Sequence, residues 1–159
     1  WTSIGREDGR QGYPITRFHE HEQACIAHKV QPNLDAYQAG RNAGLREFCT
    51  PANGYELGKQ AKSYEAACPA DLEAAFLEQY ESGLGSALRL LEDDIDTKDS
   101  NLSHKERQLS YLDNDKDEKA RNRLKDEIKA METELTRLNQ ERLNLIELRQ
   151  KVRSMRPSF

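Results

Sequence analysis

The chain has 159 residues, of which 36% are hydrophobic and 33% are charged, and its formal net charge is −4. This length suits one compact domain or a small domain with an extension. So lean an apolar content is typical of exposed helices and excludes a large core along the whole chain. No apolar run is long enough to span a bilayer. No signal peptide is present and the first residue is Trp1, so we expect a processed or trimmed form, with any targeting signal or lipid anchor upstream.

The charge is divided unevenly along the chain. Residues 1–97 hold 9 Lys and Arg against 16 Asp and Glu, whereas residues 98–159 hold 15 against 12. The basic surplus lies mostly in RQKVRSMR (149–156), the one stretch that would suit nucleic acid or an anionic membrane. Because acidic residues are interspersed with the basic ones upstream, we interpret this stretch as a solvated helix end, where cations favour the helix dipole. We therefore expect no nucleic-acid partner.

The first seventy residues predict a cluster of short helices. Pro14, Pro32 and the segment CTPANG (49–54) separate them, and Asp35 and Asn53 are the predicted helix caps. The helices are predicted over residues 2–11, 16–28, 34–48 and 54–67.

A Tyr-x-x-Gly unit recurs in and beyond these helices, at Tyr37/Gly40, Tyr55/Gly58 and Tyr80/Gly83. Glycine in a helix interior is less favourable than alanine by about 1 kcal/mol, so its repeated use needs a compensating gain. We interpret the unit as a device for close helix packing, in which aromatic rings cover glycine faces. A glycine-lined pocket is the functional alternative.

The three cysteines, Cys25, Cys49 and Cys68, each lie at the end of a predicted helix. If those helices alternate in direction, Cys25 and Cys68 share one end of the bundle, and we predict a disulfide between them. Cys49 is then free or pairs with a cysteine upstream. Three buried, reduced thiols are the alternative.

One segment carries metal-ligating residue types. His21, Cys25 and His28 follow the spacing i, i+4, i+7 and share one helical face, as zinc or copper ligands do. Because a disulfide would consume Cys25, we interpret the segment as a polar helix face and predict no metal and no other cofactor. Residues 113–124 begin like a calcium loop but lack its glycine and its final glutamate.

No catalytic grouping stands out, and we predict that the chain is not an enzyme. The glycines of GREDGRQG (5–12) have no preceding strand, so phosphate-binding mechanisms lack their context. An enzyme that uses Asp8, Arg41 and the glycine-lined face is retained as a third hypothesis, and a pocket in which Asp8 and Arg41 converge would favour it.

From residue 70 onward the sequence reads in heptads on both sides of DNDKDE (113–118), which predicts two helices joined by a turn near residues 113–116. If the helices fold back antiparallel, residue numbers of opposed pairs sum to a constant. They sum to 229 or 230 for Leu84 with Leu145, Leu91 with Leu138, Ile95 with Leu135 and Leu102 with Ile128. We therefore predict an antiparallel coiled-coil hairpin; one uninterrupted helix that dimerises is the alternative.

The residues before the hairpin resemble an uncharacterised family of proteobacterial envelope proteins, domain of unknown function family 2799, over residues 1–85. The family pattern usually shows a glycine at the position where this chain has Ala61 or Lys62. The residues that carry the resemblance are Trp1, Gly5, Asp8, Gly9, Gly12, His21, Cys25, Pro32, Tyr37, Gly40, Arg41, Gly44, Leu45, Cys49, Pro51, Asn53, Gly54, Gly58, Tyr64, Cys68, Pro69, Phe76, Tyr80 and Gly83.

The resemblance implies a secreted lipoprotein in the periplasm, tethered to the outer membrane, with an upstream cysteine as a partner for the odd one. It implies no activity. An oxidising compartment also explains why short, glycine-weakened helices end in cysteines, since disulfides can stabilise them.

Together these observations predict an all-α protein with a disulfide-tied helical head at 1–70 and a coiled-coil hairpin at 71–159. The leading hypothesis is a non-enzymatic structural or protein-interaction protein whose hairpin docks another envelope protein. Self-association into a homo-oligomer stays open, and membrane contact is expected only through a lipid anchor upstream. The second hypothesis is a periplasmic binder of a metal or small ligand, using the head.

Overall fold

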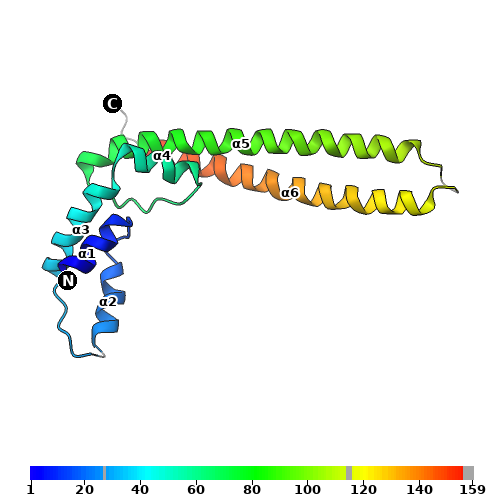
Figure 1. Cartoon of the computed structure of the whole chain (residues 1–159). Coiled ribbons are helices and arrows are strands. Elements are labelled where there is room, and N and C mark those ends of the chain that lie inside the picture. Colours follow the sequence, from blue (N-terminus) through cyan, green and yellow to red (C-terminus); the bar gives the residue numbers. More distant parts are fainter. Residues whose placement is uncertain (27, 114–115, 156–159) are drawn as a thin grey trace. The chain divides into compact units, whose positions relative to one another are not determined.

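The computed structural model describes residues 1–26, 28–113 and 116–155, and over these residues every regular element is an α-helix (Figure 1). The predicted all-α class is therefore confirmed. The helices are α1 (Thr2–Arg10), α2 (Arg17–Ile26), α3 (Leu34–Phe48), α4 (Pro51–Lys59), α5 (Ala70–Tyr111) and α6 (Glu118–Met155).

The chain divides into two compact units. The head unit holds Trp1–Gly85 and the C-terminal residues from Lys151 onward, and the hairpin unit holds Ser86–Gln150. This division falls later in the chain than the boundary that the sequence predicts after residue 70. Proline and glycine become rare at that point, but the start of α5 packs on α4 inside the head unit. The end of α6 also belongs there, since Val152 is buried and Arg153 Nε donates to Glu81 Oε1 at 2.6 Å.

The pairing of α1 with α3 depends on glycine in both helices. A Cβ built on Gly5 would overlap the backbone oxygen of Tyr37, and one on Gly40 would overlap that of Thr2. Gly9 and Gly44 repeat these contacts one helical turn further along both helices, so the two helices run parallel. The absence of side chains lets the two backbones touch, and this contact offsets the low helix propensity of glycine.

A second parallel pair, α4 with α5, repeats the register of the first. Gly58 lies against the backbone of Tyr80 and Leu84, as Gly5 lies against Tyr37 and Arg41. Gly83 lies against the backbone of Tyr55 and Lys59, as Gly40 lies against Thr2 and Arg6. The two Tyr-x-x-Gly units at Tyr37 and Tyr80 are thus equivalent positions in two copies of one packing motif.

These contacts correct one part of the sequence interpretation. Close packing at the glycines is confirmed, but what meets the helix-pair glycines is mainly backbone of the opposing helix. An aromatic ring is the nearest neighbour at Gly12, where the Phe48 ring lies close and φ is +73°. Elsewhere the rings pack beside the glycine contacts, with Trp1, Phe18 and Tyr37 near the first pair and Phe48, Tyr64, Phe76 and Tyr80 near the second.

Two helix caps and one helix end differ from prediction. Asn33, and not Asp35, caps α3, because its side chain accepts from the Ala36 N–H. Thr50 caps α4, with Pro51 in the first turn, so the predicted cap Asn53 lies inside the helix. That helix ends at Lys59, not near 67, and Ala61 beyond it adopts a positive φ of 53°.

The early end of α4 also corrects the disulfide. Cys49 pairs with Cys68, and Cys25 is a free, half-buried cysteine, so the predicted Cys25–Cys68 bond is wrong. The prediction assumed that Cys68 ends a fourth helix. Instead, residues 60–69 form a connection that leads back to the start of α5, since α5 runs parallel to α4. This return brings Cys68 next to Cys49 at the end of α3, with the two Cα atoms 5.7 Å apart.

In the hairpin unit, α5 and α6 run side by side in opposite directions (Figure 1). Ile95, Leu135 and Leu138 form a buried cluster, with Leu91 and Leu102 packed against it, and the predicted register is confirmed for these residues. The alternative of one uninterrupted helix is wrong, since α5 ends at Tyr111 and α6 begins at Glu118.

Polar contacts hold the end of the hairpin. The predicted turn at 113–116 includes residues 114 and 115, which lie outside the described residues. On either side of them, the Asp113 N–H donates to Asp117 Oδ2 at 3.0 Å, and the Lys116 N–H donates to Asp113 Oδ1 at 3.1 Å. Arg121 Nη1 donates to the carbonyl of Leu109, in the last turn of α5, and to that of Leu112, just beyond its end.

Candidate functional site

The most concentrated polar chemistry in the head unit surrounds Asp8, which is 6% exposed on α1. Its Oδ2 accepts from the hydroxyl of Tyr37 on α3 at 2.6 Å and lies 2.7 Å from Nε2 of His21 on α2. A carboxylate has only acceptors, so we assign the proton of this contact to the imidazole nitrogen. One carboxylate therefore joins three helices.

The phenol of Tyr37 serves as a donor in this arrangement. Burial, and then the hydrogen bond to Asp8, raise the pKa of Tyr37 above its ordinary value. The hydroxyl therefore keeps its proton at physiological pH and donates it to the carboxylate. Tyr37 is fully buried, whereas the side chain of His21 is 27% exposed, so the imidazole is the part of the cluster that solvent reaches.

Arg41 supplies a positive charge near this cluster. Burial lowers its pKa, and the charges of Tyr37 and Asp8 act in the opposite direction. Its Nε donates to the backbone oxygen of Tyr13 at 2.9 Å, which ties the segment after α1 to α3. Asp8 and Arg41 thus lie within electrostatic reach of each other, but the polar contact that the structure gives Arg41 is structural.

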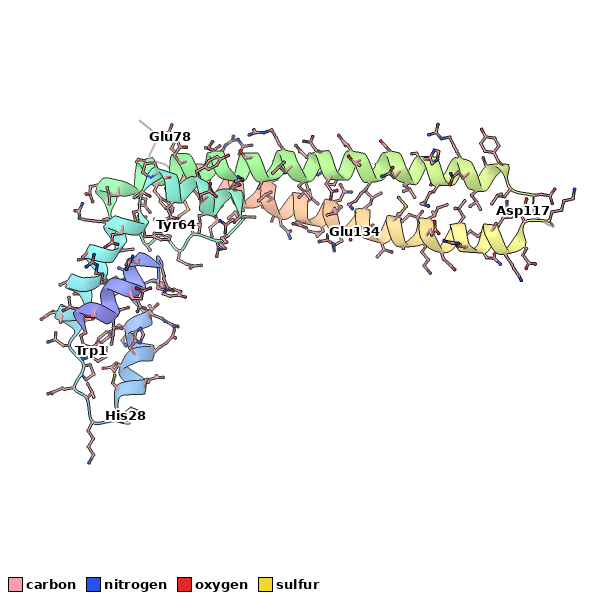
Figure 2. The ribbon with its side chains drawn as sticks, in the orientation of Figure 1. Trp1, His28, Tyr64, Glu78, Asp117 and Glu134 are labelled. Carbon is pink, nitrogen blue, oxygen red and sulfur yellow. A yellow bond between two sulfur atoms is a disulfide. The ribbon has the colours of Figure 1, made fainter. Side chains whose placement is uncertain are left out.

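The predicted metal candidates do not assemble. His21 is committed to Asp8, Cys25 lies in the last turn of α2, and His28 is exposed beyond the end of that helix (Figure 2). Within the described part of the chain, no group of three or more His, Cys, Asp or Glu side chains is arranged to hold a metal ion.

The other family-like residues hold the head together. Trp1 Nε1 donates to the Gln31 carbonyl at 3.0 Å, and Asn53 Nδ2 donates to the Phe48 carbonyl at 2.9 Å. Tyr64, in the connection between α4 and α5 (Figure 2), accepts from the Cys68 N–H and donates to Glu73. The glycines among them form the helix contacts described above: Gly9, Gly40, Gly44, Gly54 and Gly58.

A surface groove of about 440 Å³ lies beside α2 and the start of α3. Its lining residues are Ile15, Thr16, Phe18, His19, Glu22, Pro32, Leu34 and Gln38. Neither Asp8 nor Arg41 lines this groove. The enzyme hypothesis requires a pocket in which those two side chains converge, and this groove does not provide it.

Sequence reasoning missed how Asp8, His21 and Tyr37 come together. It singled out all three, but it paired Asp8 with arginine and treated His21 as a metal candidate. The detectable signal was Asp8, an acidic residue between glycines of a helix whose glycine face has to pack against another helix. A buried carboxylate needs donors, and a tyrosine and a histidine on the neighbouring predicted helices were available.

Fold and site together define an all-α protein in which glycine-packed parallel helices bury a carboxylate–phenol–imidazole cluster, followed by an antiparallel hairpin. The chain belongs to the family described as protein of unknown function (DUF2799), whose model matches residues 1–85. No curated protein and no solved structure matches the chain.

Proposed function

We propose that the protein is a non-enzymatic structural or protein-interaction component of the bacterial envelope, and that its hairpin is the docking element. The observation that carries the proposal is the surface of the hairpin unit. Tyr111 is 85% exposed, Leu90 62% and Leu143 48%. Large apolar side chains that stay exposed on a two-helix element are available to pack against another protein.

The head supports this proposal by what its polar residues do. Asp8, His21 and Tyr37 satisfy one another and join α1, α2 and α3. A catalytic group has to lie within hydrogen-bond reach of the substrate, whereas the Asp8 carboxylate is buried and hydrogen-bonded to Tyr37 and His21. We therefore regard the head as a rigid base.

The proposed compartment is the periplasm, with attachment to the outer membrane through a lipid on an upstream residue. The Cys49–Cys68 bond supports an oxidising compartment. Over the described residues, no helix combines the length and the apolar character needed to cross a bilayer.

The test compares partner capture by two forms of the protein in the periplasmic fraction of its source. The variant lacks residues 98–104 and 128–134, one heptad from each arm, which shortens the hairpin and leaves the head intact. We expect the full chain to retain specific partners that the shortened chain loses. An identical set of partners for both would contradict the proposal.

A second candidate function, binding of a small ligand by the head, is favoured by the groove beside α2. Its volume of about 440 Å³ falls in the range of small-molecule sites. Gln38→Trp would fill it. Native mass spectrometry should then show a co-purified small molecule on the unmodified chain and none on the variant; a bare mass for both would exclude this candidate.

A further inference from the structure

One side of the hairpin unit is hollowed along its length. Two hollows of about 320 and 510 Å³ follow each other along it. Their lining residues are Lys98, Asn101, Gln108 and Leu112 on α5, and Ala120, Arg123, Leu124, Glu127, Ala130, Met131 and Glu134 on α6. We call this side the groove face. The short side chains of Ala120 and Ala130 leave the hollows open, and the half-buried side chains of Leu112, Leu124 and Met131 also line them.

The two most exposed large apolar side chains of the hairpin unit belong to the same side. Leu90 and Tyr111 are 62% and 85% exposed. They are three heptads apart and follow the same helical position, next to the row that contains Asn101 and Gln108. Asn101 lies about midway between them. The groove face is therefore a hollow with an exposed apolar side chain near each end.

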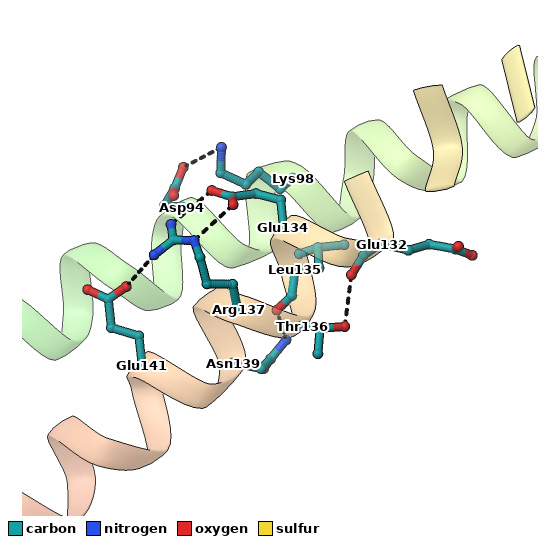
Figure 3. Close-up of polar contacts among 9 residues, drawn as sticks. All are labelled: Asp94, Lys98, Glu132, Glu134, Leu135, Thr136, Arg137, Asn139 and Glu141. Carbon is teal, nitrogen blue, oxygen red and sulfur yellow. Dashed lines mark hydrogen bonds and ion pairs between the residues drawn. The ribbon is translucent and has the colours of Figure 1, made fainter. Parts of the chain in front are cut away.

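The charges of the groove face are arranged around the same midpoint. On the Leu90 side, Arg137 lies between Glu134 and Glu141, with Asp94 and Lys98 across from them on α5 (Figure 3). On the Tyr111 side, Arg123 and Lys105 both pair with Glu127. The first half carries more acidic side chains than basic ones, and the second half carries more basic ones.

We propose that a second copy of the chain docks antiparallel on the groove face, so that two hairpins form a four-helix bundle around a two-fold axis near Asn101. Such an axis places the Leu90 end of each copy opposite the Tyr111 end of the other. Apolar side chains then meet at both ends, and the more acidic half of each copy faces the more basic half of the other. This inference extends the proposed function, since it uses the same hairpin.

The register along α5 supports the axis. Leu90 of one copy lies opposite Tyr111 of the second copy, and Thr97 lies opposite His104 of the second copy. Asn101 meets its own equivalent on the axis. Apolar therefore meets apolar at both ends, and polar meets polar in the middle.

A register along α6 that matches opposite charges has its centre near the same height. Arg123 lies opposite Glu141 of the second copy, Glu127 opposite Arg137, and Ala130 opposite Glu134. No two like charges oppose each other in this set, and a large side chain faces the hollow at Ala130. The centre of this set on α6 lies within about one helical turn of the height of Asn101, since Lys105 pairs with Glu127 and Ile95 packs with Leu135 across the hairpin.

The area is adequate for a stable dimer. The part of α5 inside the hairpin unit is about 40 Å long and two packed helices are about 20 Å wide, which gives a face on the order of 800 Å² per copy. Interfaces of standard size bury about this much on each partner. A parallel dimer would have the same area, but it would place Leu90 opposite Glu141 and Asn101 opposite Ala130.

The test uses the full chain with the free thiol removed by Cys25→Ser. Asn101→Cys in this background should form a covalent dimer under mild oxidation, because the two thiols meet on the axis. A mixture of the Asn101→Cys and Ala130→Cys chains should give no selective cross-link between the two variants. A selective cross-link between them would show a parallel dimer and overturn the proposed arrangement.

Light scattering of uncross-linked protein provides the second measurement. Leu90→Ser and Tyr111→Ser should each weaken dimerisation by about tenfold or more. Leu143→Ser, which removes the same kind of exposed side chain from the other side of the hairpin, should leave it unchanged. A monomer at every concentration would overturn the inference. If partner capture still depended on hairpin length in that case, the proposed function would stand without it.

Discussion

Tyr37 shows at the scale of one residue how the head combines packing with polarity. Its backbone oxygen touches Gly5 on α1, and its hydroxyl donates to Asp8 one turn further along that helix. Tyr80, the equivalent residue of the second pair, donates instead to the Lys62 carbonyl at 2.6 Å. The packing motif therefore does not require a carboxylate, and Asp8 is a feature of the first pair, where His21 of α2 completes its hydrogen bonding.

Removing the Tyr37 hydroxyl should destabilise the head. Tyr37→Phe leaves the buried Asp8 carboxylate short of one donor, and we expect the free energy of unfolding to fall by roughly 1–3 kcal/mol. Denaturant unfolding followed by circular dichroism measures this. Tyr13→Phe, at an exposed phenol, serves as the control. A loss no larger than that of the control would mean that the cluster contributes nothing to stability.

Glycine decides the geometry at the scale of helices. In an unobstructed helix, Gly→Ala stabilises by about 1 kcal/mol. Gly5→Ala should have the opposite sign, because the new Cβ would overlap a backbone oxygen of α3 that cannot move independently. We expect a loss of about 1–3 kcal/mol or more, visible as a lower thermal midpoint.

Ser3→Ala on the exposed side of α1 controls for helix propensity, and its effect should be small or stabilising. Gly40→Ala should resemble Gly5→Ala, because it blocks the same pair of helices from the other side. A stabilising effect of either glycine substitution would show that α1 and α3 do not touch through their backbones.

The stability of the hairpin should depend on pH. Hydrogen bonds from Lys105 and Arg123 lower the pKa of Glu127, and one from Arg137 lowers that of Glu134, below the ordinary value of 4.5. A carboxyl with a lowered folded-state pKa stabilises the fold above the ordinary value, and this contribution is lost as the pH falls through the lowered pKa. The hairpin should therefore melt earlier in acid.

The matched measurement compares thermal unfolding at about pH 7 and about pH 3 for the unmodified chain and for a Glu127→Gln, Glu134→Gln double variant. The variant should depend less on pH, since two of the titrating groups are gone. Equal pH dependence of the two proteins would show that these ion pairs contribute nothing, as many exposed pairs do.

Across the whole molecule, the sequence predicted repetitive features well and single long-range contacts poorly. The hairpin register followed from Leu91, Ile95, Leu135 and Leu138, because heptad spacing restricts which residues can meet. The disulfide did not follow from the sequence in this way, because predicting its partners depended on knowing where α4 ends. Nothing in AKSYEAAC (61–68) marks Lys59 as the last helical residue, and the backbone reverses there through Ala61.

The candidate site escaped prediction for a related reason. His21 reaches Asp8 only because α2 lies within the connection that returns the chain from α1 to the parallel helix α3. The second pair makes its return without a helix, over residues 60–69. The parallel packing of α1 with α3 and of α4 with α5 follows from which glycines touch, and this depends on the folded chain and not on local sequence spacing.

The division into a head unit and a hairpin unit carries a last prediction. The hairpin core repeats every heptad, so removal of residues 98–104 together with 128–134 joins segments whose partners still match: Ile95 keeps Leu135, and Lys105 keeps Glu127. We expect this paired deletion to leave helicity per residue and cooperative melting unchanged. Deletion of 98–104 alone shortens α5 by about 10 Å relative to α6, so one heptad of α6 loses its partner on α5 and the two helices no longer end level at the turn. Circular dichroism should show a lower melting temperature and less helix for the single deletion than for the paired one; equal loss in both would mean that α5 and α6 are not held in a unique register.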